Sequence, residues 1–322
     1  MIPDAHRIIH ADNLAWMQSQ PDNICDFTFT SPPYADARQY SIGFKMRDSE
    51  WVDWMVSRTK EMVRLTDGLV GIVIEGRTRD FSYDAIPMHL AVELHKLGYH
   101  LRKPAAYHRI GIPGSGSIEG LRNDWEFVLL VSKYRKLPWS HNSVMGTVPK
   151  FPAGGNPSHR KRDGKRVSGK PYVPPEKTNP GNVVKETYTF KEVQVLLQQY
   201  ESGNVVHCNA GGGHMGDNAA HQNEAPFPES LAEFFIRSYC PQAGTVFDPF
   251  AGSGTCMDVA IQRGRKSINI DIREDQCKIM YERKSRALSD IWLRVTGDRV
   301  LQPATKRLLE LQSIVGSRET EE

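Results

Sequence analysis

The sequence predicts an α/β protein built on a doubly wound, mostly parallel sheet. Two observations predict it. Short apolar runs alternate with amphipathic stretches along residues 1–138, which is the pattern of βα units. Further along, an apolar strand breaks into the glycine-rich turn AGSGT, and a helix and a second strand follow, as in half of a nucleotide-binding fold. We therefore expect both flanks of the chain to contribute strands to one sheet.

The first flank supplies four expected strands, each rich in β-branched, apolar or aromatic residues. They are RIIHA (7–11), DFTFT (26–30), LVGIVIE (69–75) and WEFVLLVS (125–132). Between them, apolar residues recur at helical spacing from Ser49, a candidate cap, and Gly68 is expected to end that helix. Another helix is expected from near Asp84 to Gly98.

Residues 139–225 break this pattern. They are rich in glycine and proline, have few apolar runs and contain the basic cluster HRKRDGKRVSGK (159–170), which predicts an irregular insertion. One helix is expected inside it, because Thr189 and Glu192 form a capping box and apolar residues then share one face up to Gly203.

Regular structure is expected again from Pro226. The second flank should contain a helix over SLAEFFIRSY (230–239), a strand at TVFDP (245–249), a helix ending at Gly264 and a strand at KSINIDI (266–272). A polar, helical tail follows. The predicted divisions are 1–138, 139–225, 226–290 and 291–322.

Composition narrows the class of protein without deciding its partner. The net charge of +3 and the pI near 8.5 are a mild basic bias, compatible with a polyanionic partner but too weak to demonstrate one. The five cysteines contain no C-x-x-C pair, so we expect reduced thiols, no disulfide and no metal site. The sequence has neither a signal-like start nor a long apolar run, so a cytoplasmic protein with no membrane partner is expected.

The glycine-rich turn lies in VFDPFAGSGT (246–255), where backbone N–H groups can approach a ligand at the end of a strand. A Walker loop would need a lysine here, and a dinucleotide loop would need a small residue where Met257 stands. S-adenosylmethionine is the remaining candidate ligand for this loop. Asp248 would anchor the loop and the ammonium group of the ligand, and Asp271, 23 residues later, would meet its ribose. A tight turn without a ligand is the alternative.

The stretch FTFTSPPYAD (27–36) ends a strand with two prolines. Proline has no N–H group, so Pro32 and Pro33 leave carbonyl oxygens without local donors. Ser31 adds a hydroxyl and Tyr34 a flat ring. Such a corner fits a planar amine whose N–H groups are held by oxygens while its ring stacks on tyrosine. The oxygens would stabilise positive charge on a nitrogen that attacks a methyl sulfonium. An exposed turn is the alternative.

Taken together, these motifs resemble a known family. TSPPY (30–34) and FDPFAGSGT (247–255) are similar to the acceptor and cofactor motifs of the S-adenosylmethionine-dependent DNA amino-methyltransferases. Their order resembles the circularly permuted β class. The resemblance implies a Rossmann-like methyltransferase sheet, circularly permuted, with an irregular target-recognition insertion. APFPESL (225–231) resembles the segment that packs on the methionine end of the cofactor, and HADNL (10–14) the segment whose acid contacts its adenine.

The resemblance also implies roles for individual residues. The acceptor corner, or catalytic set, is Ser31, Pro32, Pro33 and Tyr34. The cofactor-binding set is Asp12, Phe227, Asp248, Phe250, Gly252, Ser253, Gly254, Thr255 and Asp271. The residues expected to neutralise DNA phosphates are Arg160, Lys161, Arg162, Lys165 and Arg166.

The implied activity is methyl transfer to a base amine of double-stranded DNA, which requires the base to be flipped out of the duplex. Enzymes of the family that act on adenine usually carry Asp or Asn where this chain has Ser31, so the N4 of cytosine is the expected acceptor. The alternatives are adenine N6, an RNA or protein amide, and a catalytically silent DNA-binding module. A companion restriction endonuclease is an expected partner.

Overall fold

The computed structural model describes residues 5–35, 44–109, 119–121, 123–155, 158–185 and 227–296. The helix expected between Thr189 and Gly203 lies outside these ranges. Within them, no helix has both the length and the apolar character that crossing a membrane requires.

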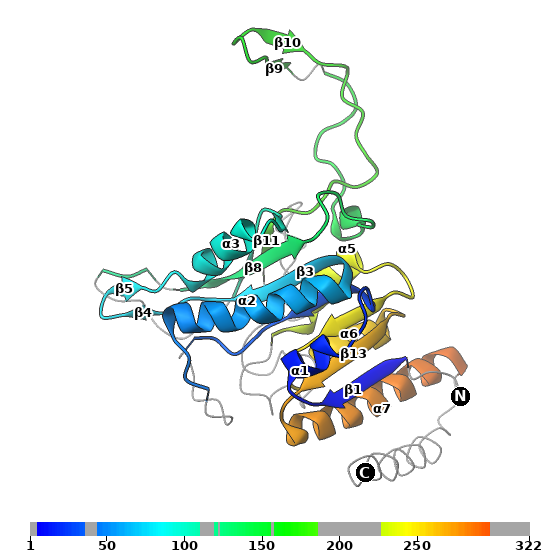
Figure 1. The fold of residues 1–322 in the computed structure, drawn as a ribbon. Coiled ribbons are helices and arrows are strands. Elements are labelled where there is room, and N and C mark those ends of the chain that lie inside the picture. The colour runs from blue at the N-terminus through cyan, green and yellow to red at the C-terminus, as the bar shows by residue number, and fades with distance from the viewer. Residues whose placement is uncertain are drawn as a thin grey trace.

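A nine-stranded sheet forms the centre of the molecule, in the order β1-β13-β12-β2-β3-β8-β7-β11, with β6 beside β8 (Figure 1). Its strands are β1 (His6–His10), β2 (Cys25–Thr30), β3 (Thr66–Ile74), β6 (His100–Leu101), β7 (Ala105–His108), β8 (Trp125–Ser132), β11 (Val183–Lys185), β12 (Thr245–Asp248) and β13 (Lys266–Asp271). Neighbours from β1 to β3 are parallel, whereas β8 is antiparallel to both β3 and β7. The predicted α/β class with a mostly parallel sheet is confirmed.

Helices cover both faces of this sheet. They are α1 (Asn13–Gln18), α2 (Asp48–Leu65), α3 (Ile86–Lys96), α5 (Glu229–Tyr239), α6 (Thr255–Gln262) and α7 (Glu274–Thr296), with a 3-10 turn η1 (Asn142–Met145). Successive residues of a strand point to opposite faces. In β3, Ile72 and Ile74 therefore pack in the cluster formed with α1, α2 and α3, while Leu69 and Val73 pack in the cluster formed with α5 and α6.

The first long helix differs from its prediction at both ends. It begins at Asp48, directly after Arg47, which makes no side-chain capping bond, so Ser49 is not the cap. It ends at Leu65, and Gly68 lies in β3 rather than stopping the helix. A Cβ atom at Gly68 would lie 2.2 Å from the carbonyl oxygen of Asp26. Glycine is needed there because two strands approach closely, not because a helix ends.

The part of the predicted insertion that the structure describes contains more regular structure than expected. Its strand β11 pairs in parallel with β7 and extends the main sheet. Two further strands, β9 (Ser158–Arg160) and β10 (Arg166–Ser168), form an antiparallel hairpin that stands apart from the body in Figure 1. We call residues 146–155 and 158–178, which carry this hairpin, the arm. A second small hairpin, β4 (Thr78–Arg79) with β5 (Ser82–Tyr83), lies at the left of the view.

Helix α7 extends into the predicted C-terminal tail. It runs without interruption past the boundary predicted between residues 290 and 291. Arg283 and Lys284 on it are buried, and Lys284 Nζ donates to the carbonyl oxygen of His6 at 2.8 Å. These two basic residues, which precede the predicted tail, are therefore part of the folded body.

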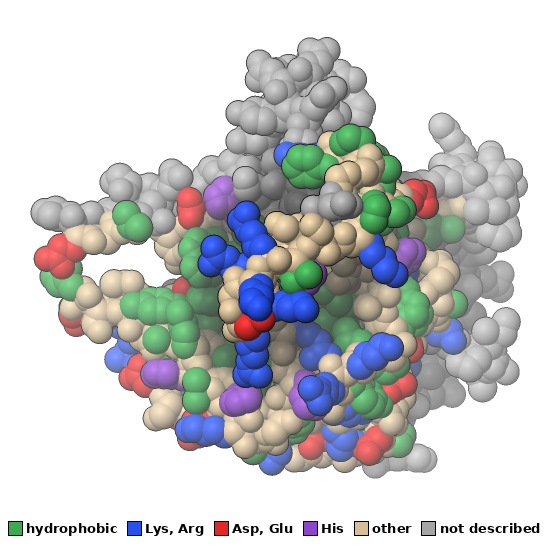
Figure 2. All heavy atoms as spheres, turned by 90° about the horizontal axis from the view of Figure 1, so that it is seen from above, with side chains coloured by type: hydrophobic (Ala, Val, Ile, Leu, Met, Phe, Trp, Pro, Cys, Tyr) green, Lys and Arg blue, Asp and Glu red, His purple; other side chains and the backbone are tan. Residues whose placement is uncertain are grey.

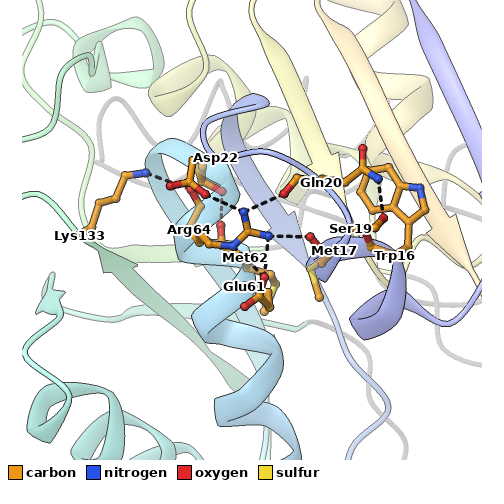
Figure 3. A network of polar contacts seen from close by, with 10 residues as sticks. Trp16, Met17, Ser19, Gln20, Asp22, Glu61, Met62, Arg64 and Lys133 are labelled. Carbon is orange, nitrogen blue, oxygen red and sulfur yellow. Dashed lines mark hydrogen bonds and ion pairs between the residues drawn. The ribbon is translucent and has the colours of Figure 1, made fainter.

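Arg64, near the end of α2, fastens this helix to the connection between α1 and β2 (Figure 3). Its guanidinium donates to the carbonyl oxygens of Met17 at 2.7 Å and Gln20 at 2.8 Å. It also pairs with the carboxylates of Asp22 and Glu61, each at 2.7 Å. These contacts fix the start of the strand that leads into the proline corner.

Candidate active site

The two predicted motifs meet at the carboxyl ends of β2 and β12, which are parallel neighbours. Thr30, the last residue of β2, donates from Oγ1 to Oδ1 of Asp248 at 2.6 Å. Cys256, in the first turn of α6, donates from Sγ to the carbonyl oxygen of Phe29 at 3.3 Å. The proline corner and the glycine loop are more than two hundred residues apart in the chain, yet they leave adjacent strand ends.

Two carboxylates hold the glycine loop. The N–H of Phe250 donates to Asp248 Oδ1 at 3.1 Å, and the N–H of Gly252 donates to Asp271 Oδ2 at 2.8 Å. Gly254 has φ +84°, and a Cβ atom there would lie 2.8 Å from Met280 Cγ. Only glycine adopts this conformation without strain in so little space. The loop is thus preformed at the N-terminal end of α6, where backbone N–H groups are available to a ligand.

Asp248 is nearly inaccessible, with 1% of its surface exposed. Burial raises its pKa from the ordinary value of 3.8 to about 6, although hydrogen bonds from Thr30, Cys256 and Phe250 act in the opposite direction. Its second oxygen, Oδ2, is buried and makes no conventional hydrogen bond with a described residue. A buried carboxylate with so little compensation favours a positive charge nearby. An ammonium group of a ligand in the loop would supply one.

This burial predicts a pH dependence of stability. The pKa of Asp248 is higher in the folded protein than in the unfolded chain, so its contribution is fully present below about pH 4 and is lost as the pH rises through about 6. Relative to the Asp248→Asn variant, the wild-type free energy of unfolding should fall by about 3 kcal/mol as the pH rises from about 3 to about 7. Urea unfolding of both proteins across this range measures the difference, and curves that stay parallel would contradict the prediction.

The segment that contains Asp12 closes one side of the loop. Asp12 Oδ1 caps α1 by accepting from the N–H of Ala15 at 2.9 Å. The next residue, Asn13, is buried and donates from Nδ2 to the carbonyl oxygen of Pro249 at 2.9 Å. Arg58 Nε donates to Asn13 Oδ1 at 2.9 Å, and its guanidinium lies 3.6 Å from the Asp12 carboxylate. The start of α1 is therefore bonded directly to the glycine loop.

Trp54 adds a stacked layer beside this segment. The guanidinium carbon of Arg58 lies 4.1 Å from the centre of its indole ring, and the ring of Phe250 lies 5.6 Å away on centroids. Asn13, Trp54 and Arg58 were not predicted as site residues. Trp54 and Arg58 could have been found from the sequence, because they are four residues apart on one predicted helix and therefore lie on the same face, next to Trp51.

The proline corner is only partly as predicted. The carbonyl oxygen of Pro33 is not open, because Trp51 Nε1 donates to it at 2.9 Å. The carbonyl oxygen of Pro32 has no hydrogen-bond donor among the described residues. Ser31 is half-buried, and its hydroxyl lies 3.5 Å from that of Tyr34. One backbone carbonyl and one side-chain hydroxyl thus remain for an acceptor amine.

Tyr34 is held by a polar chain from the antiparallel side of the sheet. Its hydroxyl donates to Glu126 Oε2 at 2.8 Å, and Glu126 Oε1 pairs with Arg109 Nη1 at 2.8 Å. Glu75, at the end of β3, accepts from the hydroxyl of Tyr83 at 2.9 Å. Burial raises the pKa of Glu75 to about 7, and the nearby Glu126 carboxylate adds to the rise. Sequence reasoning missed Glu126, since nothing local marks a polar residue of β8 as a neighbour of the corner.

The remaining predicted cofactor residues lie around the same loop. Phe227 packs edge-on against Phe29, with ring centroids 5.5 Å apart, in front of α5. Ser253 and Thr255 are buried in the loop and the first turn of α6. Arg283 of α7 donates from Nη1 to the carbonyl oxygen of Ser253 at 3.1 Å. Arg283 was not predicted as a site residue.

The basic cluster is not part of this arrangement. Its residues lie on the arm, where Arg160 faces Arg166 across the hairpin and the N–H of Lys161 donates to the carbonyl oxygen of Lys165 at 2.9 Å. Arg162 lies in the turn between the two strands. All five basic residues of the cluster are exposed. Figure 2 looks down on this end of the molecule, and Lys and Arg side chains gather at the centre of the view. The structure presents them to an outside partner rather than to the proline corner.

In chemical terms, the site joins two acceptor oxygens at a strand end to a ligand loop with a buried carboxylate. In the part of the chain that the structure describes, His, Cys, Asp and Glu form no group of three or more that could hold a metal ion. The arrangement suits transfer of a group from a ligand in the loop to a planar amine in the corner.

Comparisons with known proteins agree with this geometry. A family model described as DNA methylase, N6_N4_Mtase, matches residues 25–282. The chain is 27% identical over 267 residues to the orphan methyltransferase M.BamHII of Bacillus amyloliquefaciens, covering 81% of this chain and 89% of that protein. It is 23% identical over 282 residues to the DNA adenine methyltransferase YhdJ of Escherichia coli, covering 87% and 83%.

Two solved structures show a similar fold. The cytosine-N4-specific PvuII DNA methyltransferase matches with a TM-score of 0.57 and 18% identity, over 91% of this chain and 94% of that one. The Thermus thermophilus protein TTHA0409, solved in a complex with S-adenosyl-L-methionine, matches with a TM-score of 0.53 and 21% identity, over 88% and 94%.

Proposed function

Since the chain belongs to the N6_N4 DNA methylase family, whose model covers residues 25–282, we propose that it transfers a methyl group from S-adenosylmethionine to the N4 of a cytosine in duplex DNA. The observation that carries the proposal is the 2.6 Å hydrogen bond between Thr30 and Asp248. It joins the residue before Ser31 to the carboxylate beneath the glycine loop, so donor and acceptor would meet at one point.

The residues around the loop fit S-adenosylmethionine. Gly252 and Gly254, both at positive φ, shape the loop, and the buried Asp248 carboxylate beneath it would attract the ammonium group of the ligand. Asp271 would accept from ribose hydroxyls, while Asp12 would lie toward the adenine. Phe227, Phe250, Ser253 and Thr255 would shape the pocket. When bound, the cofactor supplies an electrophilic methyl group on a sulfonium sulfur.

The corner would do the rest of the chemistry. Ser31 Oγ and the Pro32 carbonyl oxygen would accept the two N–H bonds of the target amine, which favours the pyramidal nitrogen whose lone pair attacks. Positive charge then grows on that nitrogen, and these fixed oxygens stabilise it. The new N–C bond would form as the S–C bond of the sulfonium breaks, and the methylated nitrogen would then lose its proton to solvent water. Tyr34, oriented by Glu126, would stack against the flipped base, while Pro33 keeps the turn rigid through its bond to Trp51.

The choice of cytosine rests on Ser31, because enzymes of the family that methylate adenine usually carry Asp or Asn there. The named relatives include both kinds, since the PvuII enzyme is cytosine-N4-specific and YhdJ is an adenine methyltransferase. Adenine N6 is therefore the second candidate. The acceptor motif precedes the cofactor motif along the chain, which supports placing the protein in the circularly permuted β class.

Duplex DNA is the proposed substrate, and the arm would neutralise its phosphates through Arg160, Lys161, Arg162, Lys165 and Arg166. Residues 139–225 would form the target-recognition region between the two catalytic parts, 1–138 and 226–290. A companion restriction endonuclease acting on the same recognition sequence is the proposed partner.

Tritiated S-adenosylmethionine and plasmid DNA test the proposal. After digestion to nucleosides, label is expected in N4-methylcytosine. Label in N6-methyladenine would overturn the base assignment, and label acquired only with RNA or protein would overturn the substrate class. A protein that kept only DNA binding would show no transfer and no rise in melting temperature with cofactor, whereas a functional pocket is stabilised by its ligand.

Asp271→Ala should weaken cofactor binding about 10–100-fold while leaving the turnover number at saturating cofactor within a few-fold. The variant removes the acceptor of the Gly252 N–H as well as the proposed ribose contact, each a charge-assisted hydrogen bond. Calorimetric titration of cofactor gives the affinity, and initial rates give the turnover number. Asp275→Ala, which changes a neighbouring exposed acid, is the matched control. Equal affinities in the three proteins would contradict the assignment.

A further inference from the structure

A pocket of about 530 Å³ lies on the α5 face of the sheet, apart from the candidate active site. Its wall includes Ser238 and Tyr239 at the end of α5, together with Arg135 and Lys136 just after β8. Because β8 is antiparallel to β3, its last residues lie beside the start of β3. The basic side of the pocket is therefore at the opposite edge of the sheet from the glycine loop and the proline corner.

The charge of this pocket is one-sided. Four cations line it, Arg102, Lys103, Arg135 and Lys136, and no aspartate or glutamate does. None of the four forms an ion pair with a described residue. Like charges gathered without counter-charges repel one another and so favour an anion.

One of the cations is already oriented. Arg102 Nη2 donates to the carbonyl oxygens of Tyr134 at 2.9 Å and Arg135 at 3.1 Å. These bonds hold the guanidinium in one place, so little side-chain entropy would be lost when it binds an anion. Arg102 comes directly after β6, whereas the exposed Arg135 and Lys136 come after β8 and can meet the ligand from the solvent side.

The floor of the pocket is apolar and partly aromatic. Leu130 and Phe235 are 5% and 1% exposed, and Phe234 and Tyr239 extend this surface. A phosphate ion alone would leave the floor without a partner. A phosphate that carries a flat ring would use both parts, because the ring buries its face on the floor while the phosphate meets the cations.

We propose that this pocket is a nucleotide-binding site, separate from the cofactor pocket, with phosphate on the four cations and the base on the apolar floor. The nucleotide has two possible sources, a free mononucleotide or a unit of the DNA strand. The second source rests on the proposed function. The position of the pocket favours the DNA strand as the source. The pocket wall contains Ser140 and Asn142, which precede the arm in the chain, and residues 179–182, which follow it.

The first experiment measures free nucleotide. Melting temperatures are recorded with cytidine monophosphate, with cytidine and with inorganic phosphate, all at saturating S-adenosylhomocysteine so that the cofactor pocket is filled. The wild type should be stabilised by the monophosphate more than by either part. The Arg135→Gln/Lys136→Gln variant should lose this gain. The control Lys60→Gln/Lys266→Gln, with the same change of charge on exposed residues elsewhere, should keep it.

The second experiment measures DNA as the source. The binding constants of a long duplex and of a duplex trimmed to the recognition sequence are measured at several salt concentrations. If the strand reaches the pocket, the slope of log K against log salt for the long duplex should fall in magnitude by about 2 in the Arg135→Gln/Lys136→Gln variant. It should not change for the trimmed duplex or in the control variant.

A lost monophosphate effect identifies the free nucleotide, and a reduced slope identifies DNA. If both are unchanged, the proposal is wrong. Circular dichroism verifies that the Arg135→Gln/Lys136→Gln variant is folded. If that variant does not fold, the same measurements are made on Lys103→Gln/Lys136→Gln, which changes one cation after β6 and one after β8. Tritium transfer by the wild type is measured separately, so loss of the proposed function and loss of this site are distinguishable.

Discussion

Replacing Arg283 by methionine should lower the free energy of unfolding by about 3–5 kcal/mol, the cost of leaving buried charges without their partner. Arg283 is fully buried, and its Nη2 pairs with Glu229 at 2.9 Å and with Asp258 at 2.8 Å. Its Nη1 donates to the carbonyl oxygen of Ser253. It thus joins α5, α6 and the glycine loop from behind, and its loss would loosen the loop as well as the fold.

Urea unfolding at neutral pH measures this effect. Arg263→Met is the control, because Arg263 pairs with Glu233 at 2.8 Å while 41% of its side chain is exposed, and such surface pairs contribute less than about 1 kcal/mol. A triple variant that also changes Glu229 and Asp258 to leucine removes the stranded carboxylates and should recover much of the loss. Equal losses of unfolding free energy in the Arg283 and Arg263 variants would show that the buried ion pairs of Arg283 contribute no more to stability than a surface ion pair.

Ser31→Ala should reduce the turnover number for methyl transfer about 10²–10³-fold, as expected when one preoriented group that stabilises the transition state is removed. Cofactor affinity should stay nearly unchanged, because Ser31 lies in the corner and not in the loop. Stability should change little too, since the one hydrogen bond shown for its hydroxyl is the 3.5 Å contact with Tyr34.

Single-turnover rates with tritiated cofactor give the effect on chemistry, and calorimetry gives the affinity. Ser289→Ala, which removes a hydroxyl from α7 that bonds only to the carbonyl oxygen of Ser285, is the matched control and should stay within about twofold of wild type. If Ser31→Ala retained its rate, or lost affinity and rate in proportion, the acceptor role of Ser31 would be refuted.

The sheet could be predicted because its central strands β3 and β8 are long and carry apolar residues on both faces. The strand at 125–132 was predicted with the ends that the structure shows, since eight consecutive residues carry the signal. By contrast β11 has three residues, and no periodicity can be read over so short a run. The same holds for β9 and β10. Their place depends on partners far along the chain, which local patterns do not report.

The glycine loop and the proline corner could be found because each is a local motif with unusual residue types. The polar contacts that hold them could not. Glu126, Arg58 and Arg283 come from β8, α2 and α7, and each reaches the site only after the sheet has formed. The pairing of Pro33 with Trp51 was missed for the same reason. Sequence spacing shows which groups are present, whereas tertiary packing decides which of them remain available.

The position of β1 at the edge of the sheet has a consequence during synthesis. Among the strands that the structure describes, its one partner is β13, where His6 aligns with Ser267, 261 residues later in the chain. At typical translation rates the first strand would wait roughly 10–50 s before its partner leaves the ribosome. During that time it is a nascent strand with unsatisfied backbone groups and needs shielding from other chains. Completion of the sheet therefore has to wait until the residues of β13 have been synthesised.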